Sequence, residues 1–232
     1  MGDPDGSPWV ANPPVSRGRQ VIPRPAEWSP GPPGPWRSLD PSSADELATV
    51  VPAAERPLAP AFPGARPSAV LLVLADGPGG PEVLLTKRSE LMRHHRGEIS
   101  FPGGRMDPGE TPVQTALREA HEEVGLQPEM VEPRGELQHL NTIVSRSYIV
   151  PIVATLPERI ELAPASPEVD RVLWVPVRAL TSADRYRSER WGRPPTDRLI
   201  HFFELDDETV WGATAHLLVA LLTAAAALSP ER

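Results

Sequence analysis

The stretch from residue 103 to residue 126, GGRMDPGETPVQTALREAHEEVGL, constrains the fold of this chain more than any other. Thr111 and Gln114 have the spacing of a helix capping box, and Pro112 suits the first helical position. Gly125 tolerates the left-handed backbone that ends a helix. The sequence therefore predicts a helix of roughly 13 residues that begins near Pro112. We expect its apolar face to enter a core through Val113, Ala116, Leu117, Ala120 and Val124.

Three glutamates, Glu119, Glu122 and Glu123, cluster on one flank of the predicted helix. Glu119 and Glu123 lie one turn apart, and like charges at that spacing destabilise a bare helix by roughly 0.2–0.5 kcal/mol. They also lie near the C-terminal end, where the helix dipole disfavours anions. Two interpretations remain, a solvated acidic face or a set of oxygen ligands for a hard divalent cation. The unfavourable placement favours the cation.

Two turns precede this helix. Residues 102–104 (Pro-Gly-Gly) predict a tight turn whose carbonyl is a candidate metal ligand. Residues 107–109 (Asp-Pro-Gly) predict a second turn that returns the chain to the helix. Glu110 follows directly, and it reaches the Arg118 guanidinium only if the loop folds back.

Gly104, Glu110 and residues 118–126 (REAHEEVGL) together resemble the Nudix box, G-x5-E-x7-R-E-U-x-E-E-x-G-U with U aliphatic. No charged or glycine position of the box is substituted. The resemblance implies an α/β fold, the α/β/α sandwich with a mixed sheet of the Nudix family. It also implies Mg²⁺ or Mn²⁺ as cofactor, held by Glu119, Glu122, Glu123 and the Gly104 carbonyl. Arg118 would orient these carboxylates with Glu110 as its partner.

A second motif lies just before the box, in residues 84–104 (LLTKRSELMRHHRGEISFPGG). It resembles the pattern L-L-T-x-R-S-x3-R-x3-G-x3-F-P-G-G that accompanies the Nudix box in coenzyme A pyrophosphatases. Arginine matches phosphate geometry through paired hydrogen bonds, and this is the basic patch of the catalytic region. The resemblance implies these substrate-binding residues: Lys87, Arg88, Ser89, Arg93, His95, Gly97, Phe101 and Gly103. The structural alternative is that these cations simply pair with neighbouring acids.

The two resemblances together imply metal-assisted hydrolysis of coenzyme A or acyl-coenzyme A to 3′,5′-ADP and (acyl-)4′-phosphopantetheine. Glu122 is the first candidate for the general base, and Glu168 is a further candidate that is equally consistent with a solvated loop acid. One alternative keeps the chemistry but takes another nucleoside diphosphate derivative, such as ADP-ribose or NADH. Another alternative is a non-catalytic module that binds a nucleotide or a partner. The retained glutamates argue against a binding module, because such a module has no need of a costly carboxylate cluster.

Residues 1–67 form a proline-rich extension with 16 of the 31 prolines. Two alternatives stay open. One is a disordered tail; the other is a segment that lies along the domain with Trp28 and Trp36 as anchors and a short helix from Ala44 to Val51 capped by Ser43. From Ser68 the composition changes to that of a folded domain, so we place the catalytic domain at 68–229 and a tail at 230–232.

Apolar runs and turn residues divide this domain into further elements. Strands are expected at 69–75, 82–88, 98–101, 135–141, 148–155, 171–175 and 198–205, with a short helix at 177–180. Pro151 predicts an edge strand or a bulge. Residues 181–195 predict an arginine-rich loop. The last helix, 213–228, is too short and too rich in alanine for a membrane span, so it packs on the sheet or forms a homodimer interface.

Composition limits the remaining possibilities. The net charge of −8 argues against nonspecific nucleic-acid binding, and the chain has no cysteine for disulfides or thiolate metal sites. No basic start followed by an apolar run indicates a signal peptide. We therefore expect a cytoplasmic enzyme with no nucleic-acid or membrane partner.

Overall fold

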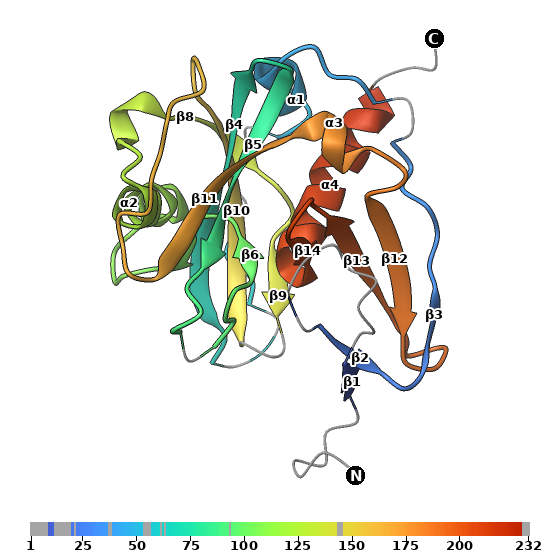
Figure 1. The fold of residues 1–232 in the computed structure, drawn as a ribbon. Helices are drawn as coiled ribbons and strands as arrows, with labels where there is room; N and C mark the ends of the chain where they lie inside the picture. The colour runs from blue at the N-terminus through green and yellow to red at the C-terminus, as the bar shows by residue number, and fades with distance from the viewer. Residues whose placement is uncertain are drawn as a thin grey trace.

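The structure is a computed structural model that describes residues 9–11, 20, 22–36, 39–52, 57–60, 62, 64–92, 94–142 and 146–228. Its main sheet has the strand order β11-β5-β4-β10-β8, with three short strands paired to its members (Figure 1). The strands of the main path are β4 (Arg66–Gly77), β5 (Gly80–Arg88), β8 (Glu132–Glu136), β10 (Ser147–Thr155) and β11 (Val169–Pro176). The short strands are β6 (Ile99–Ser100), β7 (Gly103–Arg105) and β9 (Leu140–Thr142). Because β4 and β10 are parallel and the other pairs are antiparallel, the sheet is mixed.

Helices cover both faces of this sheet. Helix α2 (Pro112–Val124) packs on one face, where Ala116, Ala120 and Val124 join a core formed with β4 and β10. On the other face lie α1 (Ala44–Ala48), α3 (Val177–Leu180) and α4 (Gly212–Leu228). The α/β/α sandwich with a mixed sheet that the sequence predicts is therefore confirmed.

A second sheet continues beyond α4, in the order β14-β13-β12-β3. Its strands are β3 (Trp28–Pro30), β12 (Tyr186–Trp191), β13 (Arg198–Glu204) and β14 (Thr209–Trp211). The remaining described elements are β1 (Trp9–Ala11), which pairs with β2 (Pro23–Pro25), and the 3₁₀ turn Pro128–Met130.

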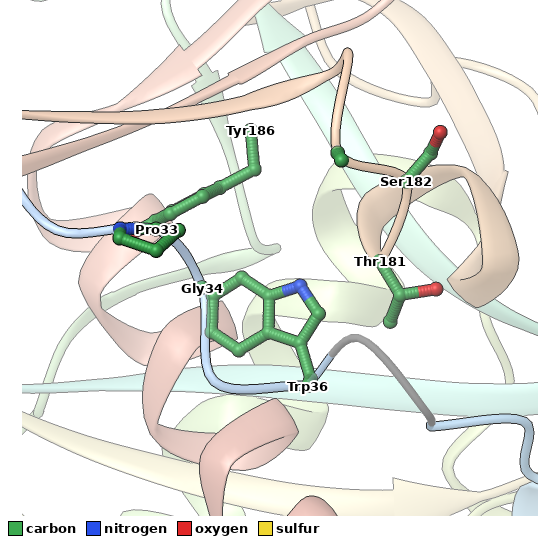
Figure 2. Close-up of a pocket in the computed structure, with 7 residues that line it drawn as sticks. Pro33, Gly34, Trp36, Thr181, Ser182 and Tyr186 are labelled. Carbon is green, nitrogen blue, oxygen red and sulfur yellow. The ribbon is translucent and has the colours of Figure 1, made fainter.

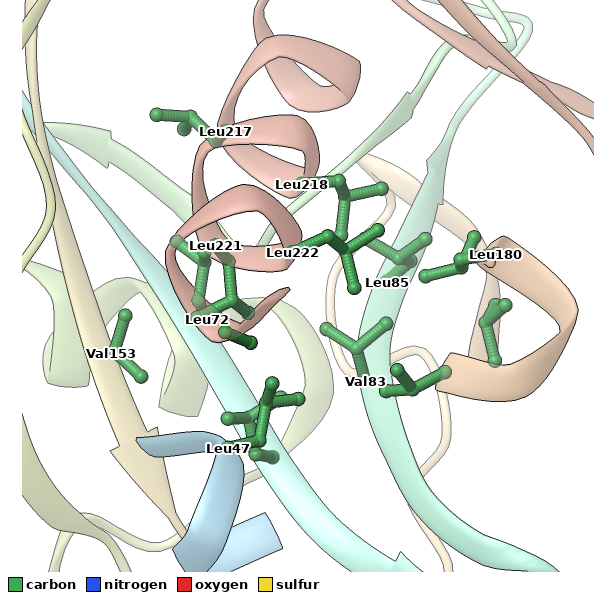
Figure 3. Packing of buried hydrophobic residues seen from close by; sticks show 14 of the residues in the cluster. Leu47, Leu72, Val83, Leu85, Val153, Leu180, Leu217, Leu218, Leu221 and Leu222 are labelled. Carbon is green, nitrogen blue, oxygen red and sulfur yellow. The ribbon is translucent and has the colours of Figure 1, made fainter. Parts of the chain in front are cut away.

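Helix α4 joins the two sheets because it is apolar around most of its circumference. Leu217, Leu218, Leu221 and Leu222 are all buried, and Figure 3 shows Leu218, Leu221 and Leu222 on the side of the helix that faces Leu72 and Leu85 of the main sheet. Of the two expectations for this helix, packing on the sheet is confirmed. Within the described part of the chain, no helix has the length and apolarity needed to cross a bilayer.

Helix α2 begins and ends as its sequence predicts. The Thr111 side chain accepts from the Gln114 backbone N–H, and the Gln114 side chain accepts from the Thr111 N–H, so the capping box is complete. Gly125 ends the helix with φ 73°, a left-handed conformation that favours glycine. The local signals are thus sufficient to fix this helix.

Three expectations about strands are wrong. The arginine-rich segment contains strand β12, in which Arg187 pairs with Glu204 and Arg190 pairs with Asp197. The expected strand at 135–141 is instead two strands, β8 and β9, with a break between them. Strand β10 is internal and not an edge, and the shift in its register with β8 falls between Val153 and Ala154, not at Pro151. Pro151 is tolerated because its carbonyl accepts from Leu137 N–H, so its missing N–H faces the break between β8 and β9.

The described part of the N-terminal extension packs along the domain. Trp36 is only 2% exposed and lies in the core shared with α4. Its indole contacts Tyr186 edge-on and forms, with Pro33 and Gly34, one wall of a small hollow beside α3 (Figure 2). The short helix capped by Ser43 is present as α1. Trp28, in contrast, is 43% exposed, with the Arg24 guanidinium over its ring.

Candidate active site

The glutamates of α2 are brought against strand β7 by two glycines. Gly103 donates its N–H to Glu123 Oε2 at 3.3 Å, and a Cβ on Gly103 would lie 2.4 Å from the Ala69 carbonyl oxygen. A Cβ on Gly104 would lie 2.4 Å from the Glu119 carboxylate. Gly103 therefore lets β7 lie close to the β4 backbone, and Gly104 leaves room for the Glu119 carboxylate against β7. The tight turn expected here is instead the start of β7.

Burial gives these carboxylates unusual protonation behaviour. Glu123 is 6% exposed, and burial raises its pKa to about 7, with Arg88 and the Gly103 N–H opposing the rise and Glu119 adding to it. Burial also raises the pKa of Glu119, which Arg118 opposes. Glu168 contributes repulsion to both carboxylates. The structure thus gathers negative charge that the nearby guanidinium groups do not fully neutralise.

The loop before α2 folds back onto the helix. Glu110 accepts two hydrogen bonds from Arg118, at 2.7 Å from Nε and 3.0 Å from Nη2, and one from the Thr115 hydroxyl at 2.7 Å. These contacts hold the pKa of Glu110 down at about 2 and raise that of Arg118. The predicted pairing of Arg118 with Glu110 is confirmed.

Arg118 also contacts two of the predicted metal ligands. Its Nη1 lies 2.9 Å from Glu119 Oε1 and 3.3 Å from Glu122 Oε2. Glu122 is on the exposed side of the helix, with its side chain 56% exposed. Among the described residues, no group of three or more acidic or histidine side chains gathers at metal-ligand spacing.

The donor chemistry nevertheless fits a hard divalent cation. Glu119 and Glu123 are oxygen donors, both are partly or fully buried, and burial raises the pKa of each. A divalent cation relieves that electrostatic cost and prefers oxygen ligands. Glu119 and Glu123 are therefore the residues that the structure best prepares to hold such an ion.

Strand β5, which ends at Arg88, and the loop that ends at Glu168, directly before β11, bring these two residues to the same place. Arg88 Nη2 lies 3.5 Å from Glu168 Oε2, and the Ser89 N–H donates to the Glu168 carbonyl at 2.8 Å. Arg88 also opposes the raised pKa of Glu123. Its Nε is buried and has no hydrogen-bond partner in the described part of the structure. Glu168, a loop residue in sequence, thus lies beside the glutamates of α2.

Lys87 does not share a face with Arg88, because successive strand residues point to opposite sides of a sheet. Lys87 Nζ contacts Glu208 Oε1 at 2.7 Å, on the face covered by α4. Glu208 is 3% exposed, and sequence analysis missed it, because no pattern connects two residues 121 positions apart. The predicted basic patch is therefore divided by the pleat of β5.

The other predicted substrate residues differ in exposure. Ser89 is 2% exposed, and Gly97 turns the chain with φ 62° beside the Glu90 carboxylate. His95 pairs with Glu98 at 2.8 Å, and this hydrogen bond raises its pKa. Phe101 is 3% exposed and packs in the α4-side core, so the structure gives it a packing role. Arg93 lies outside the described residues.

Comparison with known proteins places most of the chain in one family. A model described as the NUDIX domain matches residues 65–208. "Nudix hydrolase 3" of Caenorhabditis elegans is 46% identical over 114 residues. The matched region covers 47% of this chain and 46% of that protein, so the chain spans less than half the length of this relative. "Uncharacterized Nudix hydrolase NudL" of Photorhabdus laumondii is 36% identical over 155 residues, 66% of this chain and 81% of that protein. Among solved structures, "RenU", a Nudix hydrolase from M. smegmatis, is 31% identical over 51% of this chain and 75% of that chain, with a TM-score of 0.44.

Proposed function

The chain belongs to the Nudix hydrolase family, and from that premise we propose that it hydrolyses the pyrophosphate bond of coenzyme A or of an acylated coenzyme A. The observation that carries the proposal is the position of Arg88. This arginine of the coenzyme A pyrophosphatase motif lies 3.5 Å from Glu168 and is close enough to Glu123 of the Nudix box to oppose the rise in its pKa. A guanidinium next to a carboxylate cluster suits a substrate whose pyrophosphate must be held while one phosphorus is attacked.

We propose that Glu119, Glu122 and Glu123, with the Gly104 carbonyl, hold Mg²⁺ or Mn²⁺. When bound, such an ion neutralises charge on the pyrophosphate and lowers the pKa of a coordinated water. Arg118, fixed by Glu110, keeps Glu119 in place and would release Glu122, which is exposed and held by a single 3.3 Å contact. Arg88 and Ser89 would bind phosphate oxygens, with His95 at the exposed side of the same loop.

In the proposed reaction, a water molecule attacks one phosphorus and the bond from that phosphorus to the bridging oxygen breaks. The other phosphate leaves with the bridging oxygen, which gives 3′,5′-ADP and 4′-phosphopantetheine or its acylated form. Glu122 remains our first choice for the group that accepts the proton of the water. Glu168 is the alternative, supported by its position beside Glu119 and Glu123. Comparing the pH profiles of kcat in Glu122→Gln and Glu168→Gln tests this choice. Loss of the base removes the acidic limb of the profile, whereas loss of a metal ligand alone lowers kcat and leaves that limb in place.

The decisive experiment incubates the full chain with coenzyme A and Mg²⁺ and separates the products by chromatography. We expect 3′,5′-ADP and 4′-phosphopantetheine in equal amounts, and no products when a chelator removes the metal. Dephospho-coenzyme A, ADP-ribose and NADH serve as parallel substrates. Rapid cleavage of ADP-ribose or NADH with intact coenzyme A would overturn the substrate proposal, and no cleavage of any substrate would favour a binding module.

A further inference from the structure

A residue of the N-terminal extension reaches the loop that carries the coenzyme A motif. Gln20 Nε2 donates to the Gly97 carbonyl oxygen at 2.6 Å, across 77 positions of sequence. Gln20 Oε1 is buried and has no hydrogen-bond partner among the residues that the structure describes. Gln20 is partly buried, so what links it to the loop is this one hydrogen bond across the fold and not the burial of its side chain.

The loop that Gln20 contacts runs from Arg88 to Glu98 and is closed at its base. Arg88 N–H donates to the Glu98 carbonyl at 2.9 Å, and Gly97 N–H donates to the Arg88 carbonyl at 3.1 Å. Gly97 has φ 62°, and a Cβ there would lie 2.4 Å from the Glu90 carboxylate. The peptide unit that Gln20 contacts is therefore part of the backbone that sets the position of Arg88.

The position of this backbone affects the proposed catalytic carboxylates through the Arg88 side chain. Its guanidinium lies 3.5 Å from Glu168 and opposes the raised pKa of the buried Glu123. A small movement at the base of the 88–98 loop would move this guanidinium relative to both carboxylates. Moving a guanidinium by about 1 Å is enough to weaken its contact with a substrate phosphate.

The segment that follows Gln20 is anchored to the second sheet. Four residues later, Arg24 forms two hydrogen bonds with the Glu189 carboxylate, at 2.9 Å and 2.5 Å. Glu189 is 3% exposed and lies on β12, which also pairs with β3 of the extension. The extension is thus tied to the second sheet independently of the contact between Gln20 and Gly97.

We infer that Gln20 is a positioning residue of the substrate site, which makes the proline-rich extension a working part of that site. Through the Gly97 carbonyl, Gln20 fixes the base of the 88–98 loop and with it the Arg88 guanidinium. The inference rests on the proposed function in one respect, because it takes the 88–98 loop as the part of the site that binds the substrate phosphates.

The test compares Gln20→Ala and Gln20→Glu with wild type in the full chain. Loss of one hydrogen bond should raise KM between about twofold and tenfold while kcat stays within about twofold. Gln20→Glu should raise KM further, because a carboxylate replaces the donor that faces a carbonyl oxygen. Gln127→Ala is the matched control, since Gln127 Nε2 also donates to a glycine carbonyl, that of Gly125 at 3.1 Å, on the exposed surface. It should leave KM unchanged.

Amide hydrogen exchange gives a readout that needs no substrate. We expect faster exchange at Gly97 and Glu98 in both Gln20 variants, with unchanged exchange in α2. If the wild type spares coenzyme A but cleaves another pyrophosphate, the substrate proposal fails and KM is measured on that substrate instead. Unchanged KM in both folded Gln20 variants, with or without altered exchange, would overturn the role of Gln20.

Discussion

Glu123 is buried at a cost to the stability of the folded protein. A glutamate that is 6% exposed, with its pKa raised by burial to about 7, destabilises the folded state whenever it is ionised. The raised pKa means that Glu123 holds a proton more tightly in the folded protein than in the unfolded chain. Its destabilising effect therefore grows as the pH rises from the usual pKa of 4.5 through about 7. Such a cost is expected where a ligand will compensate it.

Replacing Glu123 should change activity and stability in opposite directions. Losing a residue that only supports a metal ligand lowers metal affinity or activity by about 10–100-fold. Losing the ligand itself should cost more, so Glu123→Gln should lower kcat by at least about a hundredfold. At pH 8 without divalent ions, the same variant should melt at a higher temperature than wild type, since it removes a buried charge. Steady-state assays and thermal unfolding check both expectations, with the exposed Glu129→Gln as control. Near-normal turnover would contradict the assignment of Glu123 as a metal ligand.

Glu110 should contribute to acid sensitivity. Its pKa is lowered to about 2, chiefly by its hydrogen bond to Arg118, so its contribution to stability is fully present above about 4.5. That contribution is lost as the pH falls from 4.5 toward 2. Glu110→Gln should therefore destabilise the protein at pH 7 more than at pH 3, as measured by chemical denaturation. An equal effect at both values would argue against a strong ion pair with Arg118.

At the scale of elements, local sequence determines helix α2, whereas tertiary packing determines the described part of the N-terminal extension. Helix α2 follows from its own caps and spacing, as its complete capping box shows. The described part of the extension takes its structure from what it packs against: Trp36 enters the core, and β3 adds to β12. Local composition favours a disordered tail, but in these described residues the burial of side chains such as Trp36 outweighs that preference.

Trp36 should therefore be a structural anchor, and Trp28 should not. Trp36→Ala removes a side chain that is 2% exposed and should cost about 3–5 kcal/mol of unfolding free energy. Trp28→Ala is the matched control. It removes a 43% exposed indole that holds one cation–π contact, which is worth about 0.5–1 kcal/mol. Urea denaturation followed by circular dichroism measures both changes, and equal costs would contradict the packing of the extension.

At the scale of the whole molecule, α4 unites two sheets of different character. The main sheet packs one face against α2, which carries Glu119 and Glu123. The second sheet holds buried polar residues, among them His201, whose Nδ1 lies 2.8 Å from the Tyr186 hydroxyl.

Because His201 is buried with a lowered pKa, we expect the protein to lose stability in mild acid. Burial lowers its pKa from 6.5 to about 4, with His216 adding a smaller effect. A depressed histidine pKa favours folding above 6.5, and this contribution is lost as the pH falls toward 4. Between pH 7 and pH 5 the loss should be about 2 kcal/mol. Chemical denaturation of wild type and His201→Gln at both values checks this. The variant should show a smaller dependence on pH, and identical slopes would contradict the assignment.

Local sequence was enough to predict helix α2, its caps and the strands that form β4 and β5, because these depend on residues close together in the chain. The pairing of Arg118 with Glu110 was implied by the resemblance to the Nudix box, and the structure confirms that contact. Tertiary structure alone decided that Lys87 faces Glu208, that Gln20 reaches Gly97 and that β12 is a strand. These features depend on contacts between distant segments, whose energies no local pattern contains.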